Sequence, residues 1–119
     1  DATTSMGGLA CREISPLTWP ILGLGADWFM TIEEDHVPPA MRALARPEGG
    51  DPTIVAGPSG CSGMAASLRL CADGDARRAL GLDATSRVLL INSEGAFGEP
   101  DLFERATGMS VAEATARMR

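Results

Sequence analysis

The chain contains no lysine, so all ten of its basic residues are arginine. No side chain can therefore form a Schiff base with a carbonyl compound, and no lysine can act as a general base. Tyrosine is also absent, and aromatic residues make up only 4% of the 119 residues. A folded core must therefore be built mainly from aliphatic and small side chains.

Positive charge is scarce as well, since the formal net charge is −6. Nucleic-acid binding needs a basic face, and so does binding to an anionic membrane surface, so both are excluded as expected functions. No apolar run reaches the roughly 20 residues of a membrane-spanning helix. The first residues do not have the pattern of a signal peptide, and the expected location is the cytoplasm.

Residues that bind metals or act as nucleophiles are few. The three cysteines, Cys11, Cys61 and Cys71, contain no C-x-x-C spacing, and their odd number argues against a disulfide framework and against a zinc site. The only histidine, His36, precedes Val37-Pro38-Pro39 in a region expected to be exposed. A Ser-His-Asp or Cys-His site built on His36 is therefore not favoured.

Helix and strand signals alternate along the chain. Residues 28–32, 53–56 and 88–92 are short apolar runs between turn-forming residues, which is typical of strands. Helix signals occur between and around them, at residues 16–22, 39–45, 64–71, 73–80, 100–107 and 110–119. This order predicts an α/β fold in three layers with a mostly parallel sheet.

Three strands are few for such a sheet, and the chain begins with Asp1 rather than methionine. Residues 1–119 are therefore expected to form a single α/β unit that is the C-terminal part of a larger domain.

The last predicted strand is followed by Asn92, Ser93, Glu94 and Gly95. In open α/β sheets ligands bind just beyond the carboxyl ends of the strands. The Ser93 hydroxyl and the Glu94 carboxylate would then lie where a ligand is expected. An ordinary turn, in which both side chains satisfy backbone groups, is the alternative that the local pattern by itself favours.

A second turn, Gly57-Pro58-Ser59-Gly60-Cys61-Ser62-Gly63, joins the strand at 53–56 to a helix. This arrangement can present backbone N–H groups to an anion. It is not a Walker loop, because the lysine is missing, and it does not have the G-x-G-x-x-G spacing. Close packing of the small residues Gly63, Ala65 and Ala66 against the sheet explains the turn equally well, so both interpretations stay open.

These two turns together resemble the C-terminal part of the fold-type II pyridoxal-phosphate enzymes, the relatives of tryptophan synthase β and threonine dehydratase. The residues Met6-Gly7-Gly8-Leu9-Ala10-Cys11, followed by Ser15-Pro16-Leu17-Thr18-Trp19-Pro20, narrow the resemblance. With them the chain is most similar to the diaminopropionate ammonia-lyases. The resemblance covers residues 6–108.

The resemblance implies a role for particular residues in binding pyridoxal 5'-phosphate. Ser93 matches the hydroxyl residue that faces the pyridine nitrogen, and Glu94 follows it. Gly8 and Leu9 match a loop that runs beside the cofactor, and Ser59 matches a segment near the cofactor ring. The lysine and the main phosphate loop of the family lie upstream of the matching region, so this chain is not expected to hold the cofactor covalently.

The resulting hypothesis is a fragment or divergent relative of an ammonia-lyase that eliminates the β-amino group of an amino acid such as 2,3-diaminopropionate. The fragment is not expected to be active alone. Its expected partners are a small amino-acid substrate and either further copies of the chain or a missing N-terminal segment. A non-catalytic α/β domain for ligand binding or interaction is the alternative function.

Overall fold

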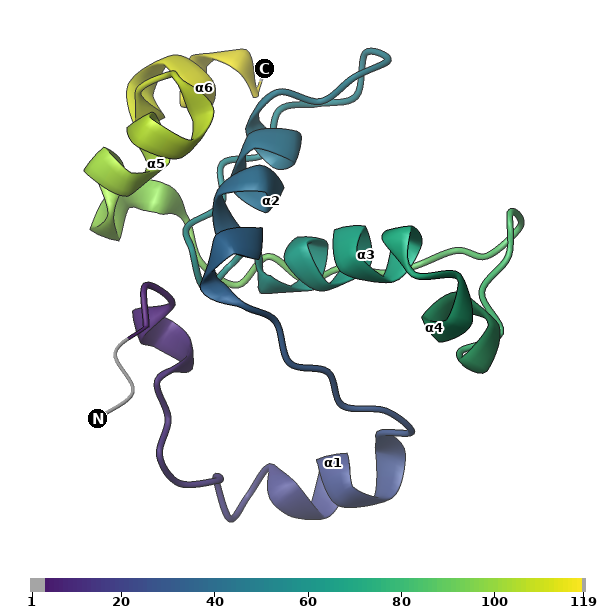
Figure 1. Cartoon of the computed structure of the whole chain (residues 1–119). Helices are drawn as coiled ribbons and strands as arrows, with labels where there is room; N and C mark the ends of the chain where they lie inside the picture. The colour runs from purple at the N-terminus through teal and green to yellow at the C-terminus, as the bar shows by residue number, and fades with distance from the viewer. Residues whose placement is uncertain (1–3, 119) are drawn as a thin grey trace.

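The computed structural model describes residues 4–118, and the regular structure in this range is helical (Figure 1). In chain order the elements are η1 (Gly7–Leu9), α1 (Trp19–Gly25), η2 (Glu34–His36), α2 (Val37–Ala45), α3 (Ser62–Ala72), α4 (Gly74–Ala79), η3 (Ala96–Gly98), α5 (Pro100–Thr107) and α6 (Val111–Arg117).

The prediction of a three-layer, mostly parallel sheet is wrong, because no strand forms within residues 4–118. Just after residues 53–56 and 88–92, the Gly57 N–H donates to the Glu94 carbonyl at 2.9 Å, and no backbone hydrogen bond joins the two segments themselves within residues 4–118. A sheet needs a repeating ladder of such bonds. The apolar pattern identified segments without helix, but a strand also needs a paired neighbour, which the described chain does not supply.

The core lies where α2 packs against α5 and α3. Phe103 of α5 and Val37 and Met41 of α2 are the bulkiest buried apolar side chains, each no more than 1% exposed. Figure 1 shows α5 and α6 on one side of α2, and α3 running away from its base toward α4. The helix α1 lies apart from this core, at the end of a long connection without helix.

Arg42 of α2 and Arg46, the residue after α2, join this helix to the end of α5. The Arg42 Nε donates to the Ala106 carbonyl at 3.0 Å, and the Arg46 Nη2 donates to the Gly108 carbonyl at 2.9 Å. The last carbonyls of a helix have no partners within the helix, so these bonds satisfy groups that would otherwise be left unpaired. Gly108 ends α5 with a φ of 70°, the left-handed conformation that favours glycine.

The prolines of α1 and α2 lie in the first turn of each helix, and both helices start at other residues than predicted. The helix α2 begins at Val37, with Pro38 and Pro39 both in its first turn. The helix α1 begins at Trp19, later than the predicted start at Pro16, and Pro20 falls in its first turn. Both arrangements are stable because the first N–H groups of a helix have no partner within the helix, so proline loses nothing there.

The predicted capping box at the start of α6 is confirmed, since Ser110 and Glu113 bond to each other's backbone. We expect Ser110→Ala to lower the free energy of unfolding by about 1 kcal/mol. The Ser110 backbone N–H, and then its hydroxyl, hold the pKa of Glu113 below its ordinary value of 4.5. A lowered folded-state pKa gives stability that is present above pH 4.5 and lost as the pH falls through the lowered value.

Urea unfolding of the wild type and of Ser110→Ala at a series of pH values checks this expectation. The difference between the two proteins should be largest near neutral pH and should shrink in acid. A difference that is constant down to pH 2 would show that the Glu113 carboxylate plays no part in the cap.

Candidate functional site

Three segments that are distant in the sequence meet at one place. The Gly8 N–H donates to the Ser59 Oγ at 3.0 Å, and the Ser59 N–H donates to the Glu94 Oε2 at 3.0 Å. Ser59 is buried, with 3% of its surface exposed. The structure therefore brings together three of the five residues predicted to face a cofactor, and we call Gly8, Ser59 and Glu94 the Ser59 cluster.

Close approach of backbones explains the glycines in the turn. A Cβ on Gly60 would overlap the Asn92 side chain and the Glu94 carbonyl. A Cβ on Gly57 would lie 2.6 Å from the Gly95 carbonyl oxygen, which is too close for any real contact. The turn at residues 57–61 is buried and packs directly on the turn at residues 92–96.

Several N–H groups of the glycine-rich turn donate to acceptors within the protein. The Cys61 N–H donates to the Gly57 carbonyl at 3.0 Å, and the Ser62 N–H donates to the Ser59 carbonyl at 3.3 Å. Together with the bond from the Ser59 N–H to Glu94, these contacts remove three of the N–H groups that an anion could have used. The turn itself is closely packed on residues 92–95, but the sheet against which Gly63, Ala65 and Ala66 were expected to pack does not form within residues 4–118.

Ser93 and Leu9 lie next to the Ser59 cluster along the chain, and both are exposed. Within residues 4–118 the structure shows no hydrogen bond from the Ser93 hydroxyl, which is therefore available to a ligand. The neighbouring residues are held more firmly, because the Asn92 Nδ2 donates to the Val55 carbonyl at 3.3 Å and the Glu94 N–H donates to the Asn92 Oδ1 at 3.4 Å. Asn92 was not among the predicted site residues, although a side-chain amide followed by Ser-Glu-Gly is a recognisable turn signal.

The Glu94 carboxylate joins the two turns, so its removal should lower the stability of the protein. Glu94→Ala leaves the buried Ser59 N–H without its acceptor, so we expect the free energy of unfolding to fall by about 1–3 kcal/mol. Glu94→Gln keeps an oxygen acceptor of the same reach and should lose about 1 kcal/mol or less. Urea unfolding of both variants measures the difference, and equal losses would contradict the bond.

Cys61 is buried and does not have the properties of a nucleophile. Its thiol lies 3.3 Å from the Pro58 carbonyl and 3.8 Å from the Val37 carbonyl, and it can donate to either. Burial is the main cause that raises the pKa of the Cys61 thiol to about 11, so the thiol stays protonated near neutral pH.

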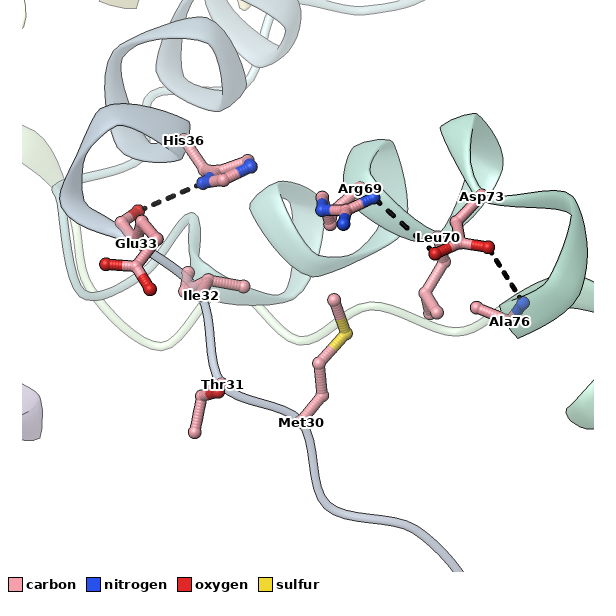
Figure 2. Close-up of a pocket in the computed structure, with 9 residues that line it drawn as sticks. All are labelled: Met30, Thr31, Ile32, Glu33, His36, Arg69, Leu70, Asp73 and Ala76. Atoms are coloured by element: carbon pink, nitrogen blue, oxygen red, sulfur yellow. Dashed lines mark hydrogen bonds and ion pairs between the residues drawn. The ribbon is translucent and has the colours of Figure 1, made fainter.

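His36 lies at a separate cavity of about 270 Å³ between α3 and the connection before α2 (Figure 2). Its Nδ1 lies 2.9 Å from a carboxylate oxygen of Asp35 and 3.3 Å from the Glu33 carbonyl, while Arg69 pairs with Asp73 at 3.7 Å. No serine or cysteine lines this cavity, so the nucleophile of a Ser-His-Asp or Cys-His site does not lie in it beside His36.

A search of residues 4–118 found no cluster of three or more histidine, cysteine, aspartate or glutamate side chains arranged to hold a metal ion. In the same range, no helix has the length and apolar character needed to cross a membrane.

Comparison with curated proteins finds similarity to ammonia-lyases. The diaminopropionate ammonia-lyase of Escherichia coli K12 is 42% identical over 64 residues, a stretch that covers 54% of this chain and 16% of that protein. The enzyme of the same name from Salmonella typhimurium LT2 is 34% identical over 108 residues, covering 87% of this chain and 26% of that protein. This chain thus spans about a quarter or less of the length of these relatives.

No family model matches the chain, and no solved structure matches it. The predicted relationship to diaminopropionate ammonia-lyases is therefore supported by sequence similarity over part of their length. Its extension to the fold-type II superfamily stays a prediction.

Proposed function

We propose that this chain forms part of a pyridoxal-phosphate-dependent ammonia-lyase and supplies one side of the cofactor cleft. The observation that carries the proposal is the 34% identity to a diaminopropionate ammonia-lyase over 108 residues. The Ser59 cluster adds support, because it joins the loop at Gly8 to the two turns that resemble the same enzymes.

The residues present fit a role in contacting the cofactor without anchoring it. Pyridoxal phosphate supplies an electron sink for elimination at the β-carbon of an amino acid. The Ser93 hydroxyl has no partner within residues 4–118, so it can hydrogen-bond to a pyridine nitrogen. A hydroxyl leaves that nitrogen unprotonated, which suits a reaction whose leaving group takes away the electrons. The chain has no lysine, so the covalent attachment must come from outside it.

The other predicted site residues divide into two kinds. Gly8 and Leu9 lie on the exposed loop of η1, where they would run beside the cofactor. Ser59 and Glu94 are bonded to each other, so we propose that they hold this loop and the Ser93 turn at a fixed separation. The proposed substrate is a small amino acid such as 2,3-diaminopropionate, which would be converted to pyruvate and ammonia.

A chimera tests the proposal. The Salmonella enzyme, with its matching stretch replaced by this chain, should release ammonia from 2,3-diaminopropionate. Ser93→Ala in the chimera should lower kcat by about 10-fold. This factor corresponds to the free energy that one hydrogen bond contributes to the activation barrier. Ser67→Ala, on the partly exposed surface of α3, is the matched control and should leave kcat unchanged.

The chimera also separates the possible failures. A chimera that binds pyridoxal phosphate, as judged by its absorbance, but releases no ammonia would overturn the assignment of the reaction. An active chimera that is insensitive to Ser93→Ala would overturn the role of Ser93 alone. The alternative of an anion-binding domain without catalysis is weakened, because the N–H groups of Ser59, Cys61 and Ser62 bond within the protein.

A further inference from the structure

Asn92 is the only residue of the chain with a side-chain amide, because the sequence contains no glutamine. An amide is neutral and can both donate and accept hydrogen bonds. The Asn92 Nδ2 donates to the Val55 carbonyl at 3.3 Å, and the Asn92 Oδ1 accepts from the Glu94 N–H at 3.4 Å. Both hydrogen bonds of this side chain therefore act on the backbone around Ser93, which lies between Asn92 and Glu94.

Both neighbours of Ser93 are held to the buried segment at residues 55–59. Asn92 is joined to this segment by its side chain, and Glu94 is joined to it by its carbonyl, which accepts from the Gly57 N–H at 2.9 Å. Ser93 itself is exposed. The backbone on either side of Ser93 is thus anchored, while the Ser93 side chain stays accessible to a ligand.

The position opposite Asn92 has no side chain. A Cβ on Gly60 would overlap the Asn92 Oδ1 and the Glu94 backbone, so the amide lies directly against the glycine backbone. Val55 is only 7% exposed, and no backbone N–H of residues 4–118 donates to its carbonyl. A buried carbonyl needs a partner, and the Asn92 amide supplies one. Shape and hydrogen bonding together fix the Asn92 side chain.

We propose that Asn92 is a positioning residue for Ser93. Its amide fixes the backbone on both sides of Ser93 and so sets the direction of the hydroxyl that meets the pyridine nitrogen of the cofactor. Asn92 acts through Ser93 and needs no contact of its own with cofactor or substrate. Hydrogen bonds weaken steeply as their angle departs from linearity, so a turn that is free to rotate would lose much of this contact. That Ser93 meets pyridoxal phosphate rests on the proposed function, whereas the anchoring of the turn is a property of this chain by itself.

Two variants separate the hydrogen bonds of Asn92 from its packing. Leucine has nearly the shape of asparagine but cannot donate or accept, so Asn92→Leu removes both hydrogen bonds and keeps the bulk of the side chain over Gly60. Asn92→Ala removes the bulk as well. Positioning by the hydrogen bonds predicts that Ser93 loses its order in both variants, whereas packing alone predicts a loss only in Asn92→Ala.

Nuclear magnetic resonance of the chain tests the anchoring without cofactor. Because the sequence has no glutamine, Asn92 gives the only pair of side-chain NH₂ signals in a ¹H–¹⁵N spectrum. Their exchange with water should be at least about 5-fold slower than in free asparagine. The order parameter of the Ser93 N–H should be about 0.85, as in rigid backbone, and should fall below about 0.6 in Asn92→Leu. An order parameter that is the same in the wild type and in Asn92→Leu would overturn the proposal.

A double-mutant cycle in the Salmonella chimera tests the link to Ser93. Asn92→Leu should lower kcat by about 3–10-fold, no more than the loss expected for Ser93→Ala, and should change KM by less than about 2-fold. In the Ser93→Ala background the same change should lower kcat by less than about 2-fold, because the hydroxyl that Asn92 positions is gone. Ser67→Ala, on the partly exposed surface of α3, is the control and should leave kcat unchanged in both backgrounds.

The cycle and the spectra distinguish the possible failures. Equal losses of kcat from Asn92→Leu with and without the Ser93 hydroxyl would show a general structural effect and would contradict the positioning role. A chimera that releases no ammonia at all would overturn the proposed function. The spectra of the chain alone would then still decide whether Asn92 fixes Ser93.

Discussion

Gly60→Ala is expected to destabilise the protein by about 3 kcal/mol or more, the upper range for forcing an extra carbon into a packed site. The added Cβ would overlap the Asn92 side chain and the Glu94 backbone, and neither can move without breaking the bonds that join the two turns. The Glu94 carbonyl and N–H are backbone atoms, which cannot yield as the end of a flexible side chain can. The variant should therefore lose the Ser59 cluster as well as stability.

Gly63→Ala is the matched control, three residues along the same chain. Its Cβ would lie 3.7 Å from the Leu90 side chain, which is an ordinary contact. Because Gly63 lies within α3, alanine should be neutral or stabilise the helix by up to about 1 kcal/mol. Urea unfolding of the two variants measures the contrast, and a loss of less than 1 kcal/mol for Gly60→Ala would contradict the tight approach of the turns.

Phe103→Ala should have the largest effect on the core, with a loss of about 3–5 kcal/mol in the free energy of unfolding. The Phe103 side chain is completely buried in α5, at the face that packs on α2. The chain has few aromatic residues, and its other buried core residues are mostly alanine, valine and methionine. Phe103 is the only aromatic side chain in the buried core of residues 4–118, so no second ring fills the space that it leaves.

Phe97→Ala provides the comparison, because Phe97 is 75% exposed and its truncation should change stability by about 0.5 kcal/mol or less. Thermal and urea unfolding, followed by far-ultraviolet circular dichroism, distinguish the two variants. Equal losses would show that α5 does not pack on α2 as described.

The helices were predictable because their signals are local. Proline, serine and aspartate at the starts and glycine at the ends place α3, α4, α5 and α6 within one or two residues of the expected ranges. The start of α2 was predicted less well, because two successive prolines suggest a break. They are harmless in the first turn of a helix, where their missing N–H groups have no partner to lose.

The sheet was not predictable from the same information. Residues 88–92 have the composition of a buried strand. Composition shows which surroundings a segment prefers, but it does not show that the fold provides them. Pairing depends on a second segment at the right distance and in the right direction. No backbone hydrogen bond joins residues 53–56 to residues 88–92 within residues 4–118, so the pattern was read correctly as not helical and incorrectly as part of a sheet.

The site was predictable in part. The glycines at intervals of three and the Asn-Ser-Glu-Gly sequence marked the two turns, and the resemblance to ammonia-lyases joined them to Gly8. The alternative of an ordinary turn had the Glu94 side chain bonded to a backbone group, but the sequence did not show that this group is the distant Ser59 N–H. That bond links residues 35 positions apart, and such contacts leave no local pattern.

The residues of the Ser59 cluster are far apart in the sequence, and this separation affects the order in which the protein folds. Its two hydrogen bonds close chain segments with sequence separations of 51 and 35 residues, whereas the helices form from contacts within a few residues. Closing long loops is entropically costly and slows the steps that require it. Helical signal should therefore appear early in refolding, and the site should assemble last, after the core between α2 and α5 has brought the two turns together.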